Sequence, residues 1–218
     1  SLLSPAGLTW YPWIGEKYPT APVKVLVMLE SHYINKERSN LEAISKPDFT
    51  RRIVLEQIQR DWHSNTFDNL SLCLTGTPLS ADSMKELWAK VAFYNFVQRP
   101  MPSPSARPTA SDFATGWKTF CQVADILRPN VCIFAGFEAI NHLDVLPQGL
   151  SVIGTTPWEK EGIGGVYPRP RFEITLPWGT ITGAAIRHPG AFFSADKWRG
   201  VLERQIPQIM KFLKTSVH

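Results

Sequence analysis

Three short polar clusters in this sequence carry side chains that could take part in chemistry. They are residues 30–33 (Glu-Ser-His-Tyr), Asn95, and His188 with the proline that follows it. Each lies at or near the end of an apolar run whose length suits a β-strand. Their carboxylate, imidazole and amide groups stabilise developing charge or exchange hydrogen bonds with a ligand. Because the carboxyl ends of parallel strands share one edge of a sheet, the three clusters can line a single pocket.

The elements that must position these clusters follow from the hydrophobic pattern. Runs rich in β-branched and aromatic residues predict strands, and apolar residues at helical spacing predict helices. The expected strands are residues 23–30, 91–97, 131–136, 172–176 and 180–186. The expected helices are residues 51–62, 83–90, 109–127 and 194–214. This alternation indicates βαβ-like repetition around one sheet, and therefore an α/β protein.

Three segments between these elements predict connections. Residues 99–108 contain four prolines, which favours an exposed segment with neither helix nor ladder hydrogen bonds. Residues 154–171 combine glycine, proline and charge, which is typical of a long mobile loop. The polar, asparagine-rich stretch after residue 62 also reads as a loop.

Length and composition limit the class of protein. A chain of 218 residues is long enough for one full domain, which we assign to residues 1–218. With 44% hydrophobic and 19% charged residues, the chain is neither intrinsically disordered nor made mostly of membrane spans. The net charge of +4 mildly favours a polyanionic partner. The sequence shows neither a signal peptide nor a membrane anchor, so we expect a cytoplasmic monomer that binds no membrane.

The cysteines argue against a metal or cofactor. Cys73, Cys121 and Cys132 are widely spaced and odd in number, so they predict neither a metal knuckle nor a disulfide framework. Three thiols also fall short of the four ligands of an ordinary iron–sulfur cluster. We therefore expect a protein of a reducing compartment that needs no cofactor and no metal.

The order and context of the polar clusters resemble the uracil-DNA glycosylase superfamily. In that family the first strand ends in GQDPY or GEAPG, and residues 29–33 (LESHY) look like its counterpart. A later strand carries an asparagine in a context such as LLNTVLT, which residues 93–97 (FYNFV) resemble. The family motif HPSP, followed by leucine, is similar to residues 188–192 (HPGAF). The resemblance spans residues 23–201 and implies a three-layer α/β/α domain with a central, mainly parallel four-stranded sheet.

The resemblance implies a monofunctional DNA glycosylase, which flips a pyrimidine base out of DNA and hydrolyses its N-glycosidic bond. This reaction builds positive charge on the sugar and negative charge on the departing base. Ser31 occupies the place of the family's aspartate and supplies no charge, so Glu30 is expected to orient the water or stabilise the cation. His188 is expected to hydrogen-bond the base oxygen. In the simpler alternative, Glu30 caps a helix or pairs with Arg51 or Arg52.

Base recognition is expected from four side chains. Asn95 would read the Watson–Crick edge, because an amide offers both an acceptor and donors; the alternative is a buried asparagine bonded to backbone. Tyr33 would wall the pocket, or is simply a half-buried aromatic residue. His32 replaces a family proline, and either adds a hydrogen-bonding group or is a solvated turn residue. Phe49 is the candidate for stacking under the base, with Trp62 and Phe67 as rivals.

DNA contacts are expected around the third cluster. Phe192 and Phe193 stand where the family inserts a wedge into the duplex, although either ring could instead pack against the terminal helix. Arg187 is expected to contact phosphate. Further candidates for phosphate contacts, or simply solvated surface, are Arg169, Arg171, Lys118, Lys197 and Arg199.

Other functions stay open at this point. Without the family's aspartate, the preferred base could be uracil or a modified pyrimidine such as a hypermodified cytosine, in base-excision repair or in defence against phage DNA. A non-catalytic protein could keep the fold to bind DNA or a nucleotide. A hydrolase using Ser31 with His188 is the weakest alternative, because no GxSxG signature is present.

Overall fold

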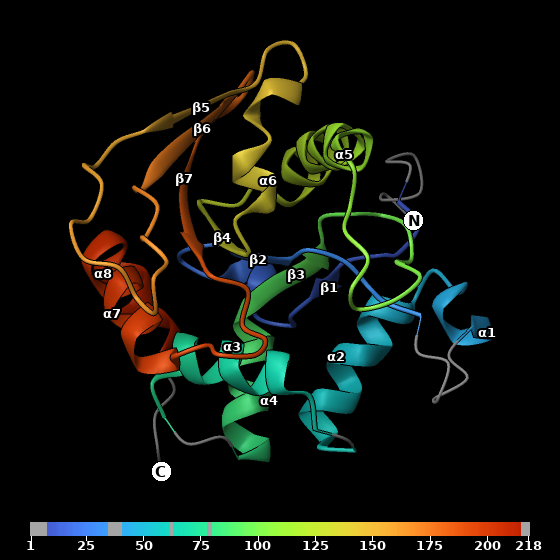
Figure 1. Ribbon diagram of the computed structural model, residues 1–218. Helices are drawn as coiled ribbons and strands as arrows, with labels where there is room; N and C mark the ends of the chain where they lie inside the picture. Colours follow the sequence, from blue (N-terminus) through green and yellow to red (C-terminus); the bar gives the residue numbers. More distant parts are fainter. Residues whose placement is uncertain (1–7, 35–40, 62, 78–79, 215–218) are drawn as a thin grey trace.

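A seven-stranded mixed β-sheet forms the centre of the structure (Figure 1). The computed structural model describes residues 8–34, 41–61, 63–77 and 80–214. The strands lie in the order β1-β3-β2-β4-β7-β6-β5. Their bounds are Trp13–Ile14 (β1), Val25–Leu29 (β2), Val91–Asn95 (β3), Val131–Ala135 (β4), Ser151–Gly154 (β5), Phe172–Leu176 (β6) and Gly179–Ile186 (β7). The expected α/β class is therefore confirmed.

Four neighbouring strands of this sheet, β3, β2, β4 and β7, run parallel, whereas β1, β5 and β6 pair antiparallel. The expected total of four strands is therefore wrong. The two-residue β1 lies in a proline- and aromatic-rich lead, and β5 is partly exposed, so neither has the continuous apolar run of a buried strand. The hairpin expected over residues 172–186 is confirmed as the β6–β7 pair.

Helices cover both faces of the sheet. Their bounds are Leu41–Ile44 (α1), Phe49–Gln59 (α2), Asn65–Thr75 (α3), Ala81–Lys90 (α4), Ala110–Leu127 (α5), Glu138–Asn141 (α6), Ala195–Gln205 (α7) and Pro207–Leu213 (α8). Helices α2, α3, α4, α7 and α8 share one apolar core with the sheet, and α5 and α6 share a second one on the opposite face (Figure 1). Alternate residues of each central strand enter the two cores, since side chains alternate along a strand.

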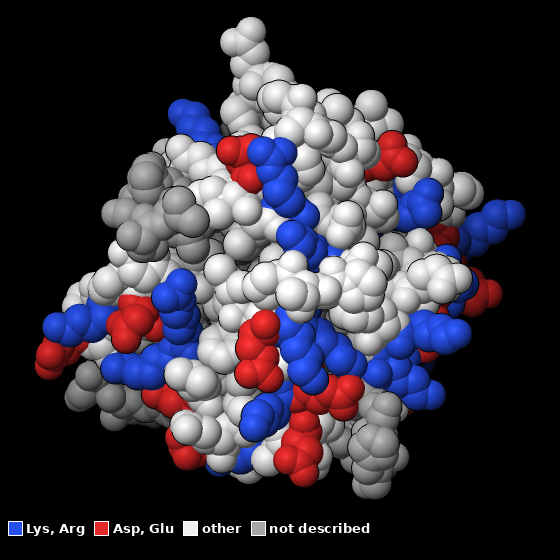
Figure 2. All heavy atoms as spheres, turned by 180° about the vertical axis from the view of Figure 1, so that it is seen from behind, with Lys and Arg blue, Asp and Glu red and all other residues white. Residues whose placement is uncertain are grey.

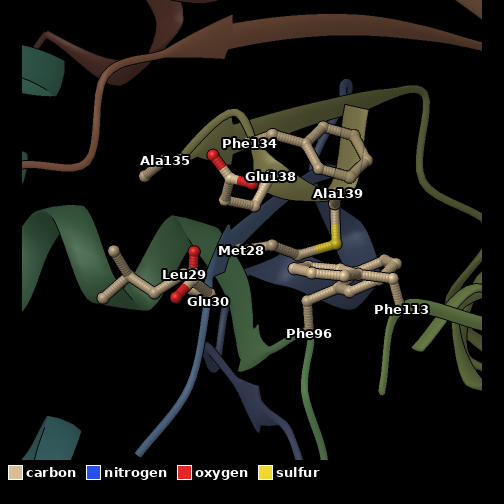
Figure 3. A pocket seen from close by; sticks show the side chains of 10 residues that line it. Met28, Leu29, Glu30, Phe96, Phe113, Phe134, Ala135, Glu138 and Ala139 are labelled. Atoms are coloured by element: carbon tan, nitrogen blue, oxygen red, sulfur yellow. The ribbon is translucent and has the colours of Figure 1, made fainter. Parts of the chain in front are cut away.

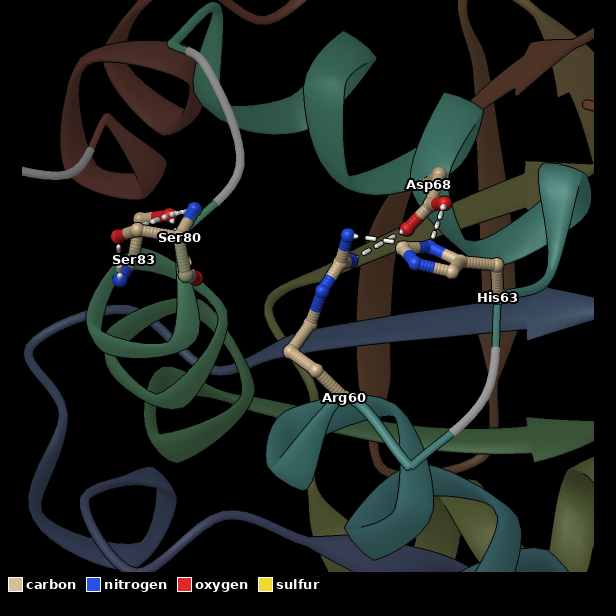
Figure 4. A network of polar contacts seen from close by, with 5 residues as sticks. All are labelled: Arg60, His63, Asp68, Ser80 and Ser83. Carbon is tan, nitrogen blue, oxygen red and sulfur yellow. Dashed lines mark hydrogen bonds and ion pairs between the residues drawn. The ribbon is translucent and has the colours of Figure 1, made fainter.

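Helix α3 was missed, because the sequence predicts a loop after residue 62. Its residues Phe67, Leu70 and Leu74 recur at helical spacing and are buried, but polar residues around them, such as Asn69, mask this apolar stripe. Arg60 ends α2 in the left-handed conformation, and its Nη1 lies 2.7 Å from Asp68 Oδ1 (Figure 4). This ion pair ties the end of α2 to the first turn of α3.

The terminal helix is divided, although the sequence predicts one helix over residues 194–214. Helix α7 ends at Gln205, and α8 begins at Pro207. A proline lacks the backbone N–H that a continuous helix needs and is suited to the first helical turn. None of the helices in the described parts of the chain is both long and apolar enough to cross a membrane.

The packing of α5 on the sheet predicts the effect of Gly116→Ala. A Cβ atom at residue 116 would lie 2.3 Å from the ring of the buried Phe96. Overpacking of this kind costs about 1–3 kcal/mol of unfolding free energy. Denaturant unfolding measures the loss. The matched control is Gly200→Ala in α7, where the nearest atom is the flexible end of Arg204 at 3.5 Å. The control should be neutral or stabilising by up to about 1 kcal/mol, because alanine favours helix. Equal effects of both changes would contradict the prediction.

Candidate active site at the carboxyl edge of the sheet

The carboxyl ends of the four parallel strands meet at one edge. Leu29 of β2 pairs with Asn95 of β3, and Ala135 of β4 pairs with Ile186 of β7. The pairing of β2 and β3 continues beyond the strands, since the Val97 N–H donates to the Glu30 carbonyl at 2.8 Å. The sequence-predicted clusters therefore leave the sheet at the same edge, and the backbone of Glu30 is held in place.

A small pocket opens at this edge, with enclosed space of roughly 10 Å³, enough for about one water molecule (Figure 3). Its lining is mainly apolar and aromatic, and it includes two carboxylates from the segments that follow β2 and β4. The lining residues are Met28, Leu29, Glu30, Phe96, Phe113, Phe134, Ala135, Gly136, Glu138 and Ala139. Sequence analysis selected only Glu30 among these residues.

Two aromatic rings of this pocket are held rigidly from behind. Phe113, near the start of α5, stacks on His142 with ring centroids 4.4 Å apart and planes 13° apart. Phe96 meets Trp117 edge to face at 5.1 Å and lies against Gly116. Both rings are only 2% exposed, so they form a packed aromatic wall behind the pocket. Both rings looked like core residues in the sequence, and no local signal distinguishes them.

Glu30 is a titratable group in the lining of the pocket. Burial raises its pKa, the neighbouring Glu138 carboxylate raises it further, and Arg107 opposes the shift. The alternative pairings of Glu30 with arginine are not present. Arg51 Nε donates to the Pro12 carbonyl at 2.8 Å, and Arg52 Nε lies 3.6 Å from Glu56. Glu30 is therefore a desolvated carboxyl group that binds a proton more readily than an exposed glutamate.

His188 follows β7 and is half-buried. Burial lowers its pKa, and the charge of Arg107 lowers it further, so the imidazole is neutral at pH 7. A Cβ atom at Gly190 would lie 3.2 Å from His188 Nδ1, so glycine lets the turn fold against the ring. Asn69 Nδ2 donates to the Pro189 carbonyl at 3.0 Å. Helix α3 therefore fixes the turn that presents His188.

Arg107 connects these two groups electrostatically, since its charge lowers the pKa of both Glu30 and His188. It belongs to the proline-rich segment 99–108, and its Nη1 donates to the carbonyls of Pro104 and Ala106 at 3.0 and 3.1 Å. The sequence indicates only an exposed connection here. A lone arginine among prolines carries no signal that could have singled it out.

Two other predicted residues bury polar atoms that have no hydrogen-bond partner. Asn95 is 2% exposed, and neither its Oδ1 nor Ser31 Oγ is bonded. The Asn95 side chain shares a strand face with Phe93, on the side of α4, and it does not line the pocket with Glu30. Buried acceptors are normally hydrogen-bonded, so the unpaired Asn95 Oδ1 is unusual. The simpler alternative, an asparagine bonded to the backbone, does not account for this atom. Ser31 makes no hydrogen bond to His188, which leaves the serine-hydrolase alternative without support.

His32 packs inside the protein, which corrects its assignment to substrate binding. Its Nε2 lies 2.8 Å from Thr50 Oγ1, and its ring meets Trp10 and Phe49 edge-on at 4.9 and 4.8 Å. Burial lowers the pKa of His32 to about 3, so it is neutral and donates no acidic proton near pH 7. Phe49 is 4% exposed in the same cluster, so its ring is not available to stack under a base.

The remaining base-contact candidates lie elsewhere. Tyr33 is half-buried, forms an isolated bridge with Met101, and is not among the pocket-lining residues. Phe67 is packed between Trp88 and Phe93 in the core, with ring centroids 5.5 Å from each. Trp62 lies outside the described residues. Phe113 and Phe96 line the pocket, but each is only 2% exposed, so they are no more available for stacking than Phe49.

The two adjacent phenylalanines after His188 differ sharply. Phe192 is 91% exposed and has φ of 59°, in the left-handed region that bulky residues rarely adopt. Phe193 instead stacks on Trp198 with ring centroids 6.4 Å apart and packs against the core. Phe192 is therefore the exposed ring of the pair, and Phe193 is a packing residue.

The two arginines of residues 154–171 make contacts that hold parts of this segment to the fold. Arg169 lies between the rings of Phe137 and Trp158, 5.1 Å from each centroid. Arg171 Nε donates to Thr155 Oγ1 at 3.2 Å. Both side chains hold the loop to the fold, so neither is a simple surface cation.

The other basic candidates are distributed over the surface. Arg199 Nη1 donates to the Leu74 carbonyl at 2.8 Å and caps the end of α3, so it is structural. Arg187 is half-buried beside Gly164, whereas Lys118 and Lys197 are exposed. Figure 2 shows acidic and basic side chains interspersed on the face opposite to that of Figure 1. The net positive charge is not gathered on that face.

No protein-family model and no curated protein matches this chain.

Within the described ranges, no group of three or more histidine, cysteine, aspartate or glutamate side chains is placed to hold a metal ion. Glu30, Glu138, His188 and Arg107 are the ionisable side chains that the structure brings to this edge.

The burial of His32 predicts a pH dependence of stability. Its folded pKa lies below the unfolded value, so the unfolded chain binds the extra proton between about pH 6.5 and pH 3. The stability associated with neutral His32 is present above pH 6.5 and is lost as the pH falls through this window. Denaturant unfolding at pH 7.5 and pH 5 should show a smaller difference for His32→Gln than for the unchanged protein. An unchanged pH dependence in His32→Gln would contradict the assignment.

Proposed function

We propose that this protein is a monofunctional DNA glycosylase, which flips a pyrimidine out of DNA and hydrolyses its N-glycosidic bond to leave an abasic site. One observation carries the proposal. A desolvated carboxyl group, Glu30, and a neutral imidazole, His188, stand at one sheet edge beside an aromatic-walled pocket, with Arg107 acting on both. These groups match the two charges that develop when such a bond breaks.

Glu30 supplies the negative charge in this proposal. As the bond to the base lengthens, the sugar gains positive charge, which a nearby carboxylate stabilises and a positioned water then attacks. The apolar wall around Glu30 strengthens this interaction, because little water screens it. Ionised Glu30 is the active form, so its raised pKa predicts activity that falls as the pH drops below that pKa.

His188 acts on the departing base. A neutral imidazole donates one N–H to the base oxygen on which negative charge builds, and it does not need to give up a proton. Arg107 favours the same charge distribution by keeping His188 neutral. Asn95 has an unbonded buried amide oxygen at the same edge, but its side chain lies on the sheet face away from the pocket, so the proposal gives it no contact to the base.

Phe192 supports a duplex-opening role. Its exposed ring stands four residues after His188, on a turn held by Asn69. Inserting an apolar side chain between base steps fills the gap that an extruded base leaves. Arg187, next to His188, is placed to contact phosphate once DNA is bound.

The arrangement of the sheet supports a uracil-DNA glycosylase-like fold. The parallel strands follow the order β3-β2-β4-β7, and the three motifs that resemble the family lie at their carboxyl edge. In a cell we expect a cytoplasmic monomer that acts on DNA without a cofactor. Its role would be base-excision repair or defence against phage DNA with modified bases.

One observation favours a second candidate, a non-catalytic protein that binds DNA or a nucleotide. Ser31, at the place of the family's aspartate, is buried with an unbonded hydroxyl and carries no charge. Such a protein would recognise an extruded base without breaking its bond. The two candidates differ in what Glu30 contributes.

The first test is base release by Glu30→Gln. Purified protein is incubated with DNA that contains uracil, thymine mismatches or phage-type modified cytosines. Free bases are then identified by mass spectrometry, and abasic sites by alkaline cleavage. Loss of the carboxylate should slow single-turnover release by about 10²-fold or more while DNA binding is retained. Glu42→Gln, on an exposed carboxylate of α1, is the matched control and should keep full activity. Tight DNA binding by the unchanged protein without release of any base would sink the glycosylase and favour the binding protein.

The second test concerns Phe192→Ala. Removing the exposed ring should weaken binding to duplex DNA about tenfold, the size of one base-stacking contact, without lowering thermal stability. Leu41→Ala removes another exposed apolar side chain and should leave binding unchanged. Equal binding by the unchanged protein and Phe192→Ala, measured by fluorescence anisotropy, would rule out the wedge.

A further inference from the structure

The segment 155–171 leaves the sheet at the same edge as the candidate active site, and the proposed mechanism does not use it. It joins β5 to β6 at the edge where β7 ends, because β6 pairs antiparallel with both strands, and it runs beside α7 (Figure 1). At its base, the Thr155 N–H donates to the Arg171 carbonyl at 2.7 Å. A Cβ atom at Gly164 would lie 3.9 Å from Arg187 Nη1, so the segment reaches the residue that follows β7.

Three flat groups form a stack at this segment. The guanidinium carbon of Arg169 lies 5.1 Å from the ring centroid of Phe137 and 5.1 Å from that of Trp158. Hydrogen bonds fix the arginine between the two rings. Its Nη2 donates to Asn141 Oδ1 at 2.9 Å, and its carbonyl accepts from Gln205 Nε2 at 2.7 Å. The stack is therefore ordered before any ligand binds.

Trp158 is the outer member of this stack and is open to solvent. Its side chain is 58% exposed and belongs to none of the apolar clusters of the described residues. The next residue, Glu159, forms an ion pair with Arg204 of α7, which holds the backbone beside the ring. A flat partner meets a surface that is already ordered, so binding costs little further side-chain entropy.

Positive charges accompany this open ring. Lys160 is exposed, Arg169 is half-exposed behind the ring, and Arg187 lies where the segment meets β7. Of the two acids in the segment, Glu159 is already paired, which leaves Glu161 as the exposed one. A fixed aromatic face with neighbouring cations is the combination that binds single-stranded nucleic acid, because bases stack on the ring and phosphates meet the cations.

We propose that Trp158 is a stacking platform for an unpaired base of single-stranded DNA. The partner is single-stranded because a base inside a duplex already stacks on both of its faces. The stacked base is a neighbour of the reacting nucleotide, since Trp158 lies outside the small pocket. The inference rests on the proposed function for DNA as the partner, and it requires neither hydrolysis nor a base in that pocket.

The test compares two chains with equal phosphate charge. One is a short oligothymidine, and the other has the same length but consists of stable abasic residues. Fluorescence anisotropy should show about tenfold tighter binding of the oligothymidine, as expected for a stacked base. Trp158→Ala should lose this preference and keep its affinity for the abasic chain, because the cations remain. Trp158→Phe keeps an aromatic face and should retain part of the preference, whereas the apolar but non-planar Trp158→Leu should not.

The matched control is Trp178→Ala. Trp178 also stacks on an arginine, with the guanidinium carbon of Arg128 4.4 Å from its ring centroid, but it lies in the β6–β7 turn at the opposite edge of the sheet. This variant should keep the full preference for oligothymidine. The inference is overturned if the unchanged protein binds both chains equally, or if Trp158→Ala retains the preference. An equal loss of affinity for duplex DNA in Trp158→Ala would also overturn it.

Base release, measured on the same variants, separates this inference from the proposed function. If the preference for oligothymidine depends on Trp158 but no base is ever released, the glycosylase fails and the stacking platform stands. If bases are released but Trp158→Ala binds both chains as the unchanged protein does, only the inference fails. Absence of binding to any DNA would overturn both.

Discussion

The shared register of the parallel strands is the constraint on which the site depends. Main-chain hydrogen bonds align the ends of β3, β2, β4 and β7, and the pairing of β2 with β3 continues past Leu29. The turns that carry Glu30, Gly136 and His188 must therefore begin at one edge, whatever their side chains are. As a result Glu30 and His188, more than 150 positions apart in the chain, leave the sheet at one edge and are both affected by the charge of Arg107.

The aromatic residues packed at this edge give the polar groups their properties. Water removed by Phe96 and Phe113 no longer solvates the Glu30 carboxylate, so burial and the nearby Glu138 act on its pKa in the same direction. Arg107 opposes that shift from outside the apolar wall. These opposing effects on its pKa leave Glu30 able to gain or lose a proton, because no ion pair holds it in the ionised form.

Backbone-level features of this protein were predictable because they depend on local patterns. The central strands and the common edge of Glu30, Asn95 and His188 follow from apolar runs and their polar ends. Features that depend on tertiary contacts could not be predicted from local patterns. His32 became a core residue because Trp10, from the N-terminal lead, packs against it, and Glu138 lines the pocket only because β4 lies beside β2.

The left-handed backbone at Phe192 makes phenylalanine an unfavourable residue at this position. A left-handed conformation costs a bulky residue about 1–2 kcal/mol, and an almost fully exposed ring recovers little of this by packing. The anchored Pro189 carbonyl on one side and the stacked Phe193 on the other hold the turn in this state. Substitution of Phe192 by glycine or asparagine would relieve the backbone strain of the turn and raise the free energy of unfolding. Retention of phenylalanine there would mark selection for what the ring meets outside the molecule.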